Sequence, residues 1–161
     1  GELLPEPAAL IAREGARVPG TDGRKMSKSY GNAIYLSESE DETAAKVMGM
    51  VTDPARKLKT DPGNPDICPL HQIHKLVGDG AEVTEWDRCC RVAECGCVAH
   101  KRKLVEDLNG YLREFRTRRA DLAATPGYAW DVLAEGAAKV RPEVEGLMGD
   151  VRRAMHVDAE R

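Results

Sequence analysis

Apolar residues recur at spacings of three and four through most of the chain after residue 68, and this periodicity constrains the fold more than any other feature. Pro69 and Pro142 fit the first position of a helix, and Gly78 fits a helix end. Aromatic residues make up only 4% of the chain, which argues against a β-sandwich or barrel. We therefore expect helices over residues 69–77, 83–96, 98–124, 129–140 and from 142 onwards. The sequence predicts a mainly α-helical fold.

One more helix is expected ahead of these, with Ser37 or Ser39 as its N-cap, because each serine is followed three residues later by Glu. The apolar face of this helix carries Ala44, Val47, Met48 and Val51. In the long helix at 98–124, the side chains expected to be buried are Leu104, Leu108, Tyr111 and Phe115. In the last helix they are Val144, Leu147, Met148, Val151 and Met155. Both tryptophans are expected in the core, Trp86 and Trp130.

Proline and glycine break up the remaining segments. Residues 52–66 contain Asp53-Pro54 and a second proline run at 61–65, which favours a rigid loop. The first 36 residues are also punctuated by proline and glycine and are expected to form loops. A catalytic loop is compatible with that segment.

Acidic and basic residues nearly balance, 27 against 24, so the formal charge of −3 gives no overall attraction to nucleic acid or a membrane. No apolar run approaches membrane-spanning length, and the acidic, proline-broken start lacks a signal-peptide pattern, so a cytoplasmic location is expected. A length of 161 residues suits about one domain. The first residue is Gly, which fits a piece of a longer polypeptide or a chain trimmed of its starting Met.

Residues 20–32, here called the KMSKS loop, carry the densest set of reactive groups. Glycines in this loop permit positive φ and close approach of the backbone to a ligand. Lys25 and Lys28 offer ammonium groups, and Ser27 and Ser29 offer hydroxyls, which bind phosphate oxygens. A mobile loop of this kind can close on a triphosphate and stabilise the charge that develops on departing pyrophosphate. The alternative is a solvated basic turn.

The run Lys-Met-Ser-Lys-Ser at 25–29 is the signature of class I aminoacyl-tRNA synthetases, and its surroundings resemble the tryptophanyl-tRNA synthetases of that class. The resemblance covers nearly the whole chain, including the Leu-Pro-Glu-Pro opening and the segments at 30–32, 50–54, 60–65, 68–69, 74–75 and 127–128. It implies an α-helical, anticodon-arm-binding type of domain at 37–161. It also implies that 1–36 is the loop-rich C-terminal edge of a Rossmann-type catalytic domain.

The resemblance further implies ATP-dependent activation of tryptophan and its transfer to tRNA(Trp), with Mg²⁺ accompanying ATP, in a homodimeric enzyme. By the same resemblance, Lys28 contacts the pyrophosphate in the transition state and Lys25 assists on the phosphates. Met26 lies near the adenine with its backbone, and Ser27 and Ser29 hydrogen-bond the triphosphate or hold the loop.

The family's His-Ile-Gly-His motif, most of its nucleotide-binding sheet and its tryptophan pocket have no counterpart in this sequence. The run from His71 to His74 lacks the glycine and follows a helix-starting proline. We therefore expect that this chain alone does not aminoacylate tRNA. The alternative function is a stand-alone helical module that binds RNA, or a metal or cluster, without catalysis. His71 and His74 could ligate a metal, but are expected to be ordinary core or surface histidines.

Four of the five cysteines lie between residues 89 and 97, and the odd number suits metal ligation or free thiols better than a disulfide framework. Zinc or an iron–sulfur cluster could be held by Cys68, Cys90, Cys97 and His100. Some members of the resembled family carry a 4Fe-4S cluster at four cysteines with this layout, and here His100 stands in place of the fourth. Cys89 or Cys95 could substitute. Ordinary buried thiols are the alternative.

Residues 88–119 hold nine basic and four acidic side chains, a local balance of +5. Because the apolar stripe occupies another face of the helix, these basic groups could bind RNA phosphates, with a solvated helix face as the alternative. The resemblance favours RNA, since this region of the family recognises the anticodon arm. The candidate tRNA-binding residues are Arg113, Arg116, Arg118 and Arg119.

Overall fold

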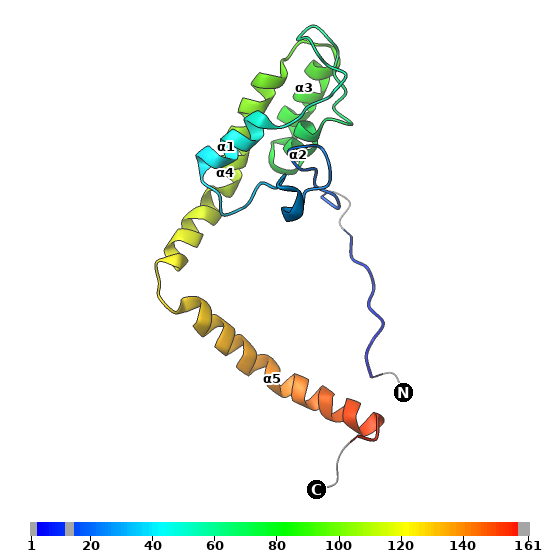
Figure 1. The fold of residues 1–161 in the computed structure, drawn as a ribbon, viewed down its shortest axis with the longest axis vertical. Coiled ribbons are helices and arrows are strands. Elements are labelled where there is room, and N and C mark those ends of the chain that lie inside the picture. Colours follow the sequence, from blue (N-terminus) through cyan, green and yellow to red (C-terminus); the bar gives the residue numbers. More distant parts are fainter. Residues whose placement is uncertain (1–2, 12–14, 158–161) are drawn as a thin grey trace. The chain divides into compact units, whose positions relative to one another are not determined.

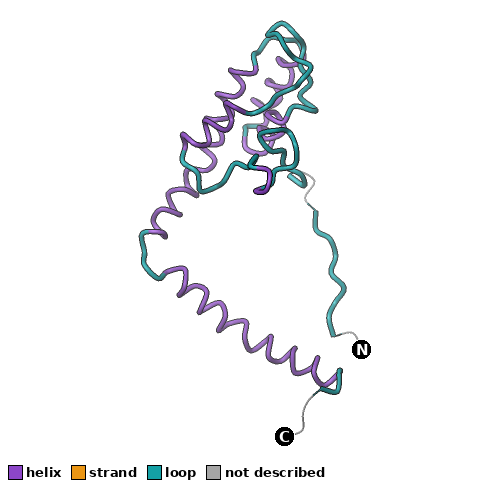
Figure 2. The backbone as a smooth tube through the Cα atoms, in the orientation of Figure 1, coloured by secondary structure: helices purple, strands orange, loops and turns teal. Residues whose placement is uncertain are grey.

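The computed structural model describes residues 3–11 and 15–157. In these residues the chain is helical (Figure 1), and the backbone trace in Figure 2 consists of helices joined by loops. The elements in chain order are η1 (Lys28–Tyr30, a 3-10 turn), α1 (Glu40–Gly49), α2 (Pro69–Val77), α3 (Gly80–Arg91), α4 (Cys97–Ala123) and α5 (Tyr128–Ala154). Extended pairing within the described ranges is limited to one antiparallel bridge, between Pro19 and Lys25. The predicted mainly α-helical fold is confirmed.

The chain divides into two compact units. One unit is Ile11–Arg119, and it contains the KMSKS loop, α1 to α3 and most of α4. The other consists of Gly1–Leu10 and Ala120–Arg161 and contains α5. The division into functional domains at residue 36 stays a prediction.

Helix α1 begins at a capping box, as predicted from Ser39. The Ser39 side chain accepts from Glu42 N, and the Glu42 carboxylate accepts from Ser39 N. The predicted buried face was partly wrong, because Val47 is buried while Met48 and Val51 are exposed. Hydrogen bonds from Asn109 to Glu40 O and from Lys101 to Met48 O place α1 alongside α4 (Figure 1).

The core of the larger unit joins α1, α2 and α4. Its buried side chains are Val47, Met50, Cys68, Leu70, Ile73, Leu104 and Leu108. Helix α2 starts with Pro69 in its first turn and is followed by Gly78, as the sequence predicted. The loop predicted at 52–66 is also confirmed, since no helix or strand forms there.

The buried row of α4 differs from the predicted one. Leu104, Leu108 and Leu112 are buried, at a spacing of four residues. Tyr111 is 66% exposed and Phe115 is 44% exposed, so both point away from the core. Positions three and four residues after Leu108 both lie on its face of the helix, and the packing of α4 on the core buries Leu112 and leaves Tyr111 exposed.

Helix α5 corrects a second prediction. Two helices were expected to meet before Pro142, but one helix runs from Tyr128 to Ala154 with Pro142 inside it. No side chain along α5 is buried, so the apolar residues predicted to be buried there are not, and Trp130 is 77% exposed. Trp86 is half-buried, with its ring stacked on His100. In the described part of the chain, no helix is both long and apolar enough to cross a membrane.

Candidate functional site

The KMSKS loop is closed at its base by backbone hydrogen bonds. Gly20 N donates to Arg24 O at 2.7 Å, and Met26 N donates to Val18 O at 2.9 Å. Gly23 turns the chain with φ at +82°, a conformation that L side chains rarely adopt. Gly23 therefore allows the turn that precedes the two lysines.

Asn32 is the centre of the loop and is only 2% exposed. Its Oδ1 accepts from Ser27 N at 2.8 Å, and its Nδ2 donates to Asp22 Oδ1 at 2.6 Å and to Lys25 O at 3.2 Å. A Cβ on Gly20 would lie 2.3 Å from the Asn32 side chain, so no other residue fits at that position without movement. One buried amide thus holds both sides of the loop.

Asp22 carries a second set of contacts. Arg24 donates to Asp22 through its backbone N at 3.0 Å and through Nε at 2.7 Å, and its guanidinium lies 4.4 Å from the centre of the Tyr30 ring. Hydrogen bonds from Asn32 and Arg24 hold the pKa of Asp22 below its usual value. The guanidinium of Arg24 is thus engaged by Asp22 and Tyr30 within the loop.

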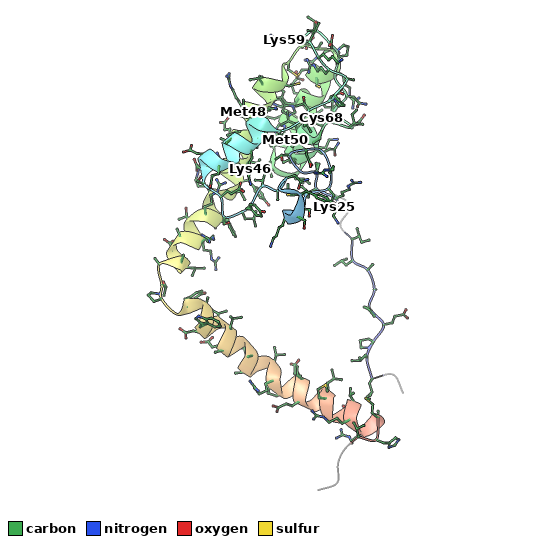
Figure 3. The ribbon with its side chains drawn as sticks, in the orientation of Figure 1. Lys25, Lys46, Met48, Met50, Lys59 and Cys68 are labelled. Atoms are coloured by element: carbon green, nitrogen blue, oxygen red, sulfur yellow. A yellow bond between two sulfur atoms is a disulfide. The ribbon has the colours of Figure 1, made fainter. Side chains whose placement is uncertain are left out.

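The two signature lysines remain exposed. Lys28 lies in the η1 turn, which Gly31 ends in the left-handed region with φ at 64°. Figure 3 labels Lys25 on the same loop. Across residues 3–11 and 15–157, no carboxylate forms an ion pair with Lys25 or Lys28. A folded loop therefore presents two ammonium groups to an anionic ligand.

The loop is fastened to the segment after α1. Val51 N donates to Thr21 O at 2.9 Å, and Thr21 N donates to Asn32 O at 2.9 Å. On the far side, Lys46 Nζ donates to Ala33 O at 2.7 Å. The KMSKS loop and α1 are thus parts of one hydrogen-bonded body within the larger unit.

The predicted metal ligands come together. A cavity of about 10 Å3 is lined by Cys68, Cys90, Cys97 and His100. A space of this size is about that needed to hold one water molecule. Binding of zinc or an iron–sulfur cluster at these residues stays a prediction. Burial also raises the pKa of the Cys68 and Cys90 thiols, which disfavours the thiolate that a metal needs.

Two cysteines depart from the expectation of metal ligands or free thiols. Cys89 and Cys95 form a disulfide, while the three other cysteines are free. The residues between them form a tight turn with Ala93 at φ 59°, which brings the two sulfurs together. Arg56 lies over this turn, and its Nη1 is 3.5 Å from Cys90 Sγ.

The predicted RNA-binding arginines do not share one environment. Arg116 is half-buried and donates to Asn109 Oδ1 at 2.8 Å and to Thr43 Oγ1 at 2.7 Å, so it ties α4 to α1. The three exposed arginines of the set are Arg113, Arg118 and Arg119. Nearby, ion pairs with acidic side chains hold Arg88, Arg91 and Lys103.

Sequence reasoning missed a third group, formed by three buried histidines. His71 and His74 on α2 lie beside His100 on α4, and one ring nitrogen of each falls within 4.8 Å of the other two. The spacing of three residues along α2 was the only signal in the sequence. The partner on α4 could not be recognised before the helices were packed.

Comparison with known proteins gives a consistent result. The family model for class I tRNA synthetases (W and Y) matches residues 1–113. The tryptophan–tRNA ligase of Aquifex aeolicus is 42% identical over 158 residues, which cover 98% of this chain and 40% of that protein. The tryptophan–tRNA ligase of Thermotoga maritima is 40% identical over 157 residues, which cover 97% of this chain and 48% of that protein.

Solved structures agree with these relatives. The tryptophanyl-tRNA synthetase of Campylobacter jejuni, crystallised with ADP and tryptophan, superposes with a TM-score of 0.76 at 30% identity. The match covers 91% of this chain and 46% of that one. The chain thus spans less than half the length of these relatives. By its sequence, its helical fold and the KMSKS loop, the chain belongs to the class I tRNA synthetases (W and Y).

Proposed function

We propose that this chain is part of a tryptophan–tRNA ligase and supplies the loop that stabilises the pyrophosphate leaving group. The reaction joins the carboxylate of tryptophan to the α-phosphorus of ATP and breaks the bond to the β-phosphate. The tryptophanyl group then passes to tRNA(Trp). The observation that carries the proposal is a loop held in shape by Asn32 with Lys25 and Lys28 exposed and unpaired within the described residues.

Each loop residue has a role that its contacts allow. Lys28 would contact the departing pyrophosphate, and Lys25 the neighbouring phosphates, because preorganised positive charge stabilises negative charge that develops in the transition state. Met26 N is occupied by Val18 O, which leaves the Met26 carbonyl to meet the adenine. Ser27 and Ser29 would bind phosphate oxygens through their hydroxyls. Mg²⁺ bound to ATP would supply further charge neutralisation.

The test begins with the codons upstream of Gly1 in the source DNA. The reading frame that contains this chain is expressed from its first start codon, and tryptophan-dependent ATP–pyrophosphate exchange is measured. We expect exchange in the wild type and a loss of about 100-fold or more in kcat for Lys28→Ala, by analogy with removal of one transition-state donor. Lys75→Ala is the matched control, because Lys75 is an exposed lysine on α2, and it should leave kcat unchanged.

Three outcomes would overturn the proposal. They are a start codon next to Gly1, no exchange by the extended polypeptide, and full exchange in Lys28→Ala. The isolated 161-residue chain is expected to show no exchange, and measurable exchange would contradict that expectation.

We further propose that tRNA lies against the exposed arginines of α4, Arg113, Arg118 and Arg119. Removal of an arginine that contacts a phosphate weakens binding to all nucleic-acid sequences. It also lowers the slope of log K against log salt concentration by about one unit. The triple change to Gln should therefore weaken tRNA binding and reduce the slope by up to about three. Arg88→Gln is the control, because its ion pairs with Glu85 and Glu94 already use its charge.

Three other expectations stay predictions. Binding of zinc or an iron–sulfur cluster at Cys68, Cys90, Cys97 and His100 is tested by zinc and iron analysis of the purified chain. This site and the histidine site proposed below exclude each other, because both use His100. The homodimer is tested by the mass of the extended polypeptide in solution. A cytoplasmic location is tested by fractionation of the source cells.

A further inference from the structure

The histidine cluster joins α2 to the first turns of α4 in the larger unit. His71, His74 and His100 are 1%, 0% and 4% exposed. His74 Nδ1 lies 2.9 Å from His100 Nε2, and the ring centroids of His71 and His100 are 5.7 Å apart. Three imidazoles packed together out of contact with water are a costly arrangement unless a ligand or a full set of hydrogen bonds satisfies them.

Two carboxylates lie next to the outer Nε2 atoms of the α2 histidines. His74 Nε2 lies 2.8 Å from Asp107 Oδ2, and His71 Nε2 lies 3.4 Å from Asp87 Oδ2. A carboxylate on the outer nitrogen of a histidine is the usual support for a metal-bound imidazole, because it fixes the ring and raises the basicity of the other nitrogen. On the inner side of the cluster, His71 Nδ1 has no partner within the described residues and His74 Nδ1 faces His100 Nε2.

His71 is the residue that hydrogen bonding does not explain. Neither of its ring nitrogens has a hydrogen-bond partner within residues 3–11 and 15–157, and both are buried. The Asp87 carboxylate is near enough for an ion pair but does not complete a hydrogen bond. An unpartnered, buried imidazole beside two others points to a missing ligand that accepts nitrogen lone pairs.

Other contacts hold the rings in place. The Trp86 ring is stacked on His100 with centroids 4.6 Å apart and planes 7° from parallel. A Cβ on Gly78 would lie 2.5 Å from His74 Cδ2, so the end of α2 closes tightly over that ring. These contacts leave the cluster little freedom to rearrange.

The rings are already in the form that binds a metal. Burial lowers the pKa of His71 to about 4 and that of His100 to about 3. Both imidazoles are therefore neutral at pH 7 and keep a lone pair. The thiols of Cys68 and Cys90, by contrast, must lose a proton whose pKa burial has raised.

We propose that His71, His74 and His100 bind one zinc ion, with His71 Nδ1, His74 Nδ1 and His100 Nε2 as its ligands. Zinc takes three histidine nitrogens at about 2.0–2.1 Å, which places ligand atoms about 3.4 Å from one another in a tetrahedron. His74 Nδ1 and His100 Nε2 must separate by about 0.5 Å to reach that spacing. The fourth position is left to water.

The proton balance is simple. His74 Nε2 donates its proton to Asp107, so His74 Nδ1 accepts from the Nε2–H of His100. Zinc binding replaces that hydrogen bond, and His100 changes to the tautomer protonated at Nδ1. The three rings stay neutral, and they release no net proton.

The cluster competes with the thiol cavity for His100. A neutral imidazole has one lone pair, so His100 can serve one ion at a time. His100 Nε2 already lies 2.9 Å from His74 Nδ1, so the proposal assigns His100 to the histidine site. The proposal does not depend on the catalytic role of the KMSKS loop, which lies elsewhere in the larger unit.

The experiment uses the full chain, reduced, stripped with EDTA and passed through a desalting column. One equivalent of Zn²⁺ is added, and the bound zinc and the shift in melting temperature are measured. Co²⁺ is added in parallel, because a cobalt–thiolate bond gives a strong near-ultraviolet charge-transfer band and histidine ligation does not. We expect one zinc per chain, a rise in melting temperature, and a cobalt spectrum without the thiolate band.

Variants separate the two sets of ligands. His71→Gln should weaken zinc binding by more than tenfold and abolish the thermal shift, and Asp107→Asn should weaken it by about 10–100-fold. Cys97→Ser, the control at the thiol cavity, should leave zinc affinity unchanged. If His71→Gln does not fold, the cobalt spectrum of the wild type still decides which atoms bind.

The proposal is overturned by a chain that binds no zinc, by a thiolate band in the cobalt spectrum, or by zinc affinity that survives in His71→Gln and disappears in Cys97→Ser. Loss of exchange activity in the extended polypeptide does not bear on it. The two proposals therefore fail separately.

Discussion

Asn32→Asp is the sharpest probe of the KMSKS loop, because it exchanges one NH2 group for an oxygen and leaves the shape of the side chain intact. The Nδ2 atom that donates to Asp22 Oδ1 and to Lys25 O becomes a charged acceptor facing two acceptors. Of the side-chain hydrogen bonds of Asn32, only the one from Ser27 N to Oδ1 is retained. The change also buries a carboxylate at a position that is 2% exposed, next to the Asp22 carboxylate.

The magnitude follows from these contacts. Two hydrogen bonds worth about 1 kcal/mol each are lost, and a buried group left without donors costs about 1–3 kcal/mol more. We therefore expect the free energy of loop opening to fall by about 3 kcal/mol, which is about two decades in the opening equilibrium. Because loops can open without unfolding the helices, most of this cost should appear locally.

Hydrogen–deuterium exchange measures this opening directly. The amides of Thr21 and Ser27, which donate to Asn32, should exchange about 100-fold faster in the variant. Asn64→Asp is the matched control, since the Asn64 side chain is exposed and serves as the acceptor for Asp66 N, which Asp retains. If exchange at Ser27 rises less than threefold in a folded Asn32→Asp chain, the amide is not what holds the loop.

Three further outcomes follow from other contacts. The pKa of Asp22 lies below its ordinary value of 3.8, chiefly because Asn32 donates to the carboxylate. The ionised Asp22 therefore stabilises the loop fully above pH 3.8, and this stabilisation is lost as the pH falls through the lower pKa of the folded state. The protection of the loop amides against hydrogen exchange, corrected for the intrinsic rate, should be level from pH 7 to about 5 and fall only in stronger acid. Arg116→Met removes the tie between α1 and α4 and should lower the free energy of unfolding by about 1–3 kcal/mol in urea titrations, whereas Arg113→Met, at an exposed position, should leave it unchanged. Gly23→Ala places a side chain at φ +82° and should cost about 1–2 kcal/mol, while Gly136→Ala inside α5 should stabilise that helix by about 0.5–1 kcal/mol; equal effects at both glycines would contradict the backbone argument.

Local signals in the sequence predicted the helix starts well. The Ser39 and Glu42 pair and the proline at 69 act through contacts within a few residues, and both begin helices where expected. The KMSKS loop was also recognised from its own residues. The sequence could not predict why this loop holds its shape. Asn32 is a common type of turn residue, and its hydrogen bonds to Asp22, Lys25 and Ser27 become visible only in the folded structure.

Errors arose where packing decides between equivalent patterns. Tyr111 and Leu112 lie three and four residues after Leu108, and periodicity alone allows either to continue the buried row. Pro142 fits a helix start, yet it can also lie inside a long helix when the neighbouring turns keep their hydrogen bonds. The histidine cluster depends on residues 26 positions apart, His74 and His100, which only the packing of α2 on α4 brings together.

The hydrogen bond from Val51 N to Thr21 O connects the KMSKS loop to the segment that follows α1. Val51 lies two residues after the last residue of α1, and α1 is tied through Thr43 to Arg116 on α4, next to the exposed arginines. A displacement of α4 that carries α1 along its axis must therefore pull on Thr21 or break that bond. If this bond couples the two places, thermodynamic reciprocity requires that a ligand on the loop change the affinity at the α4 surface by the same factor as a ligand on α4 changes the affinity at the loop.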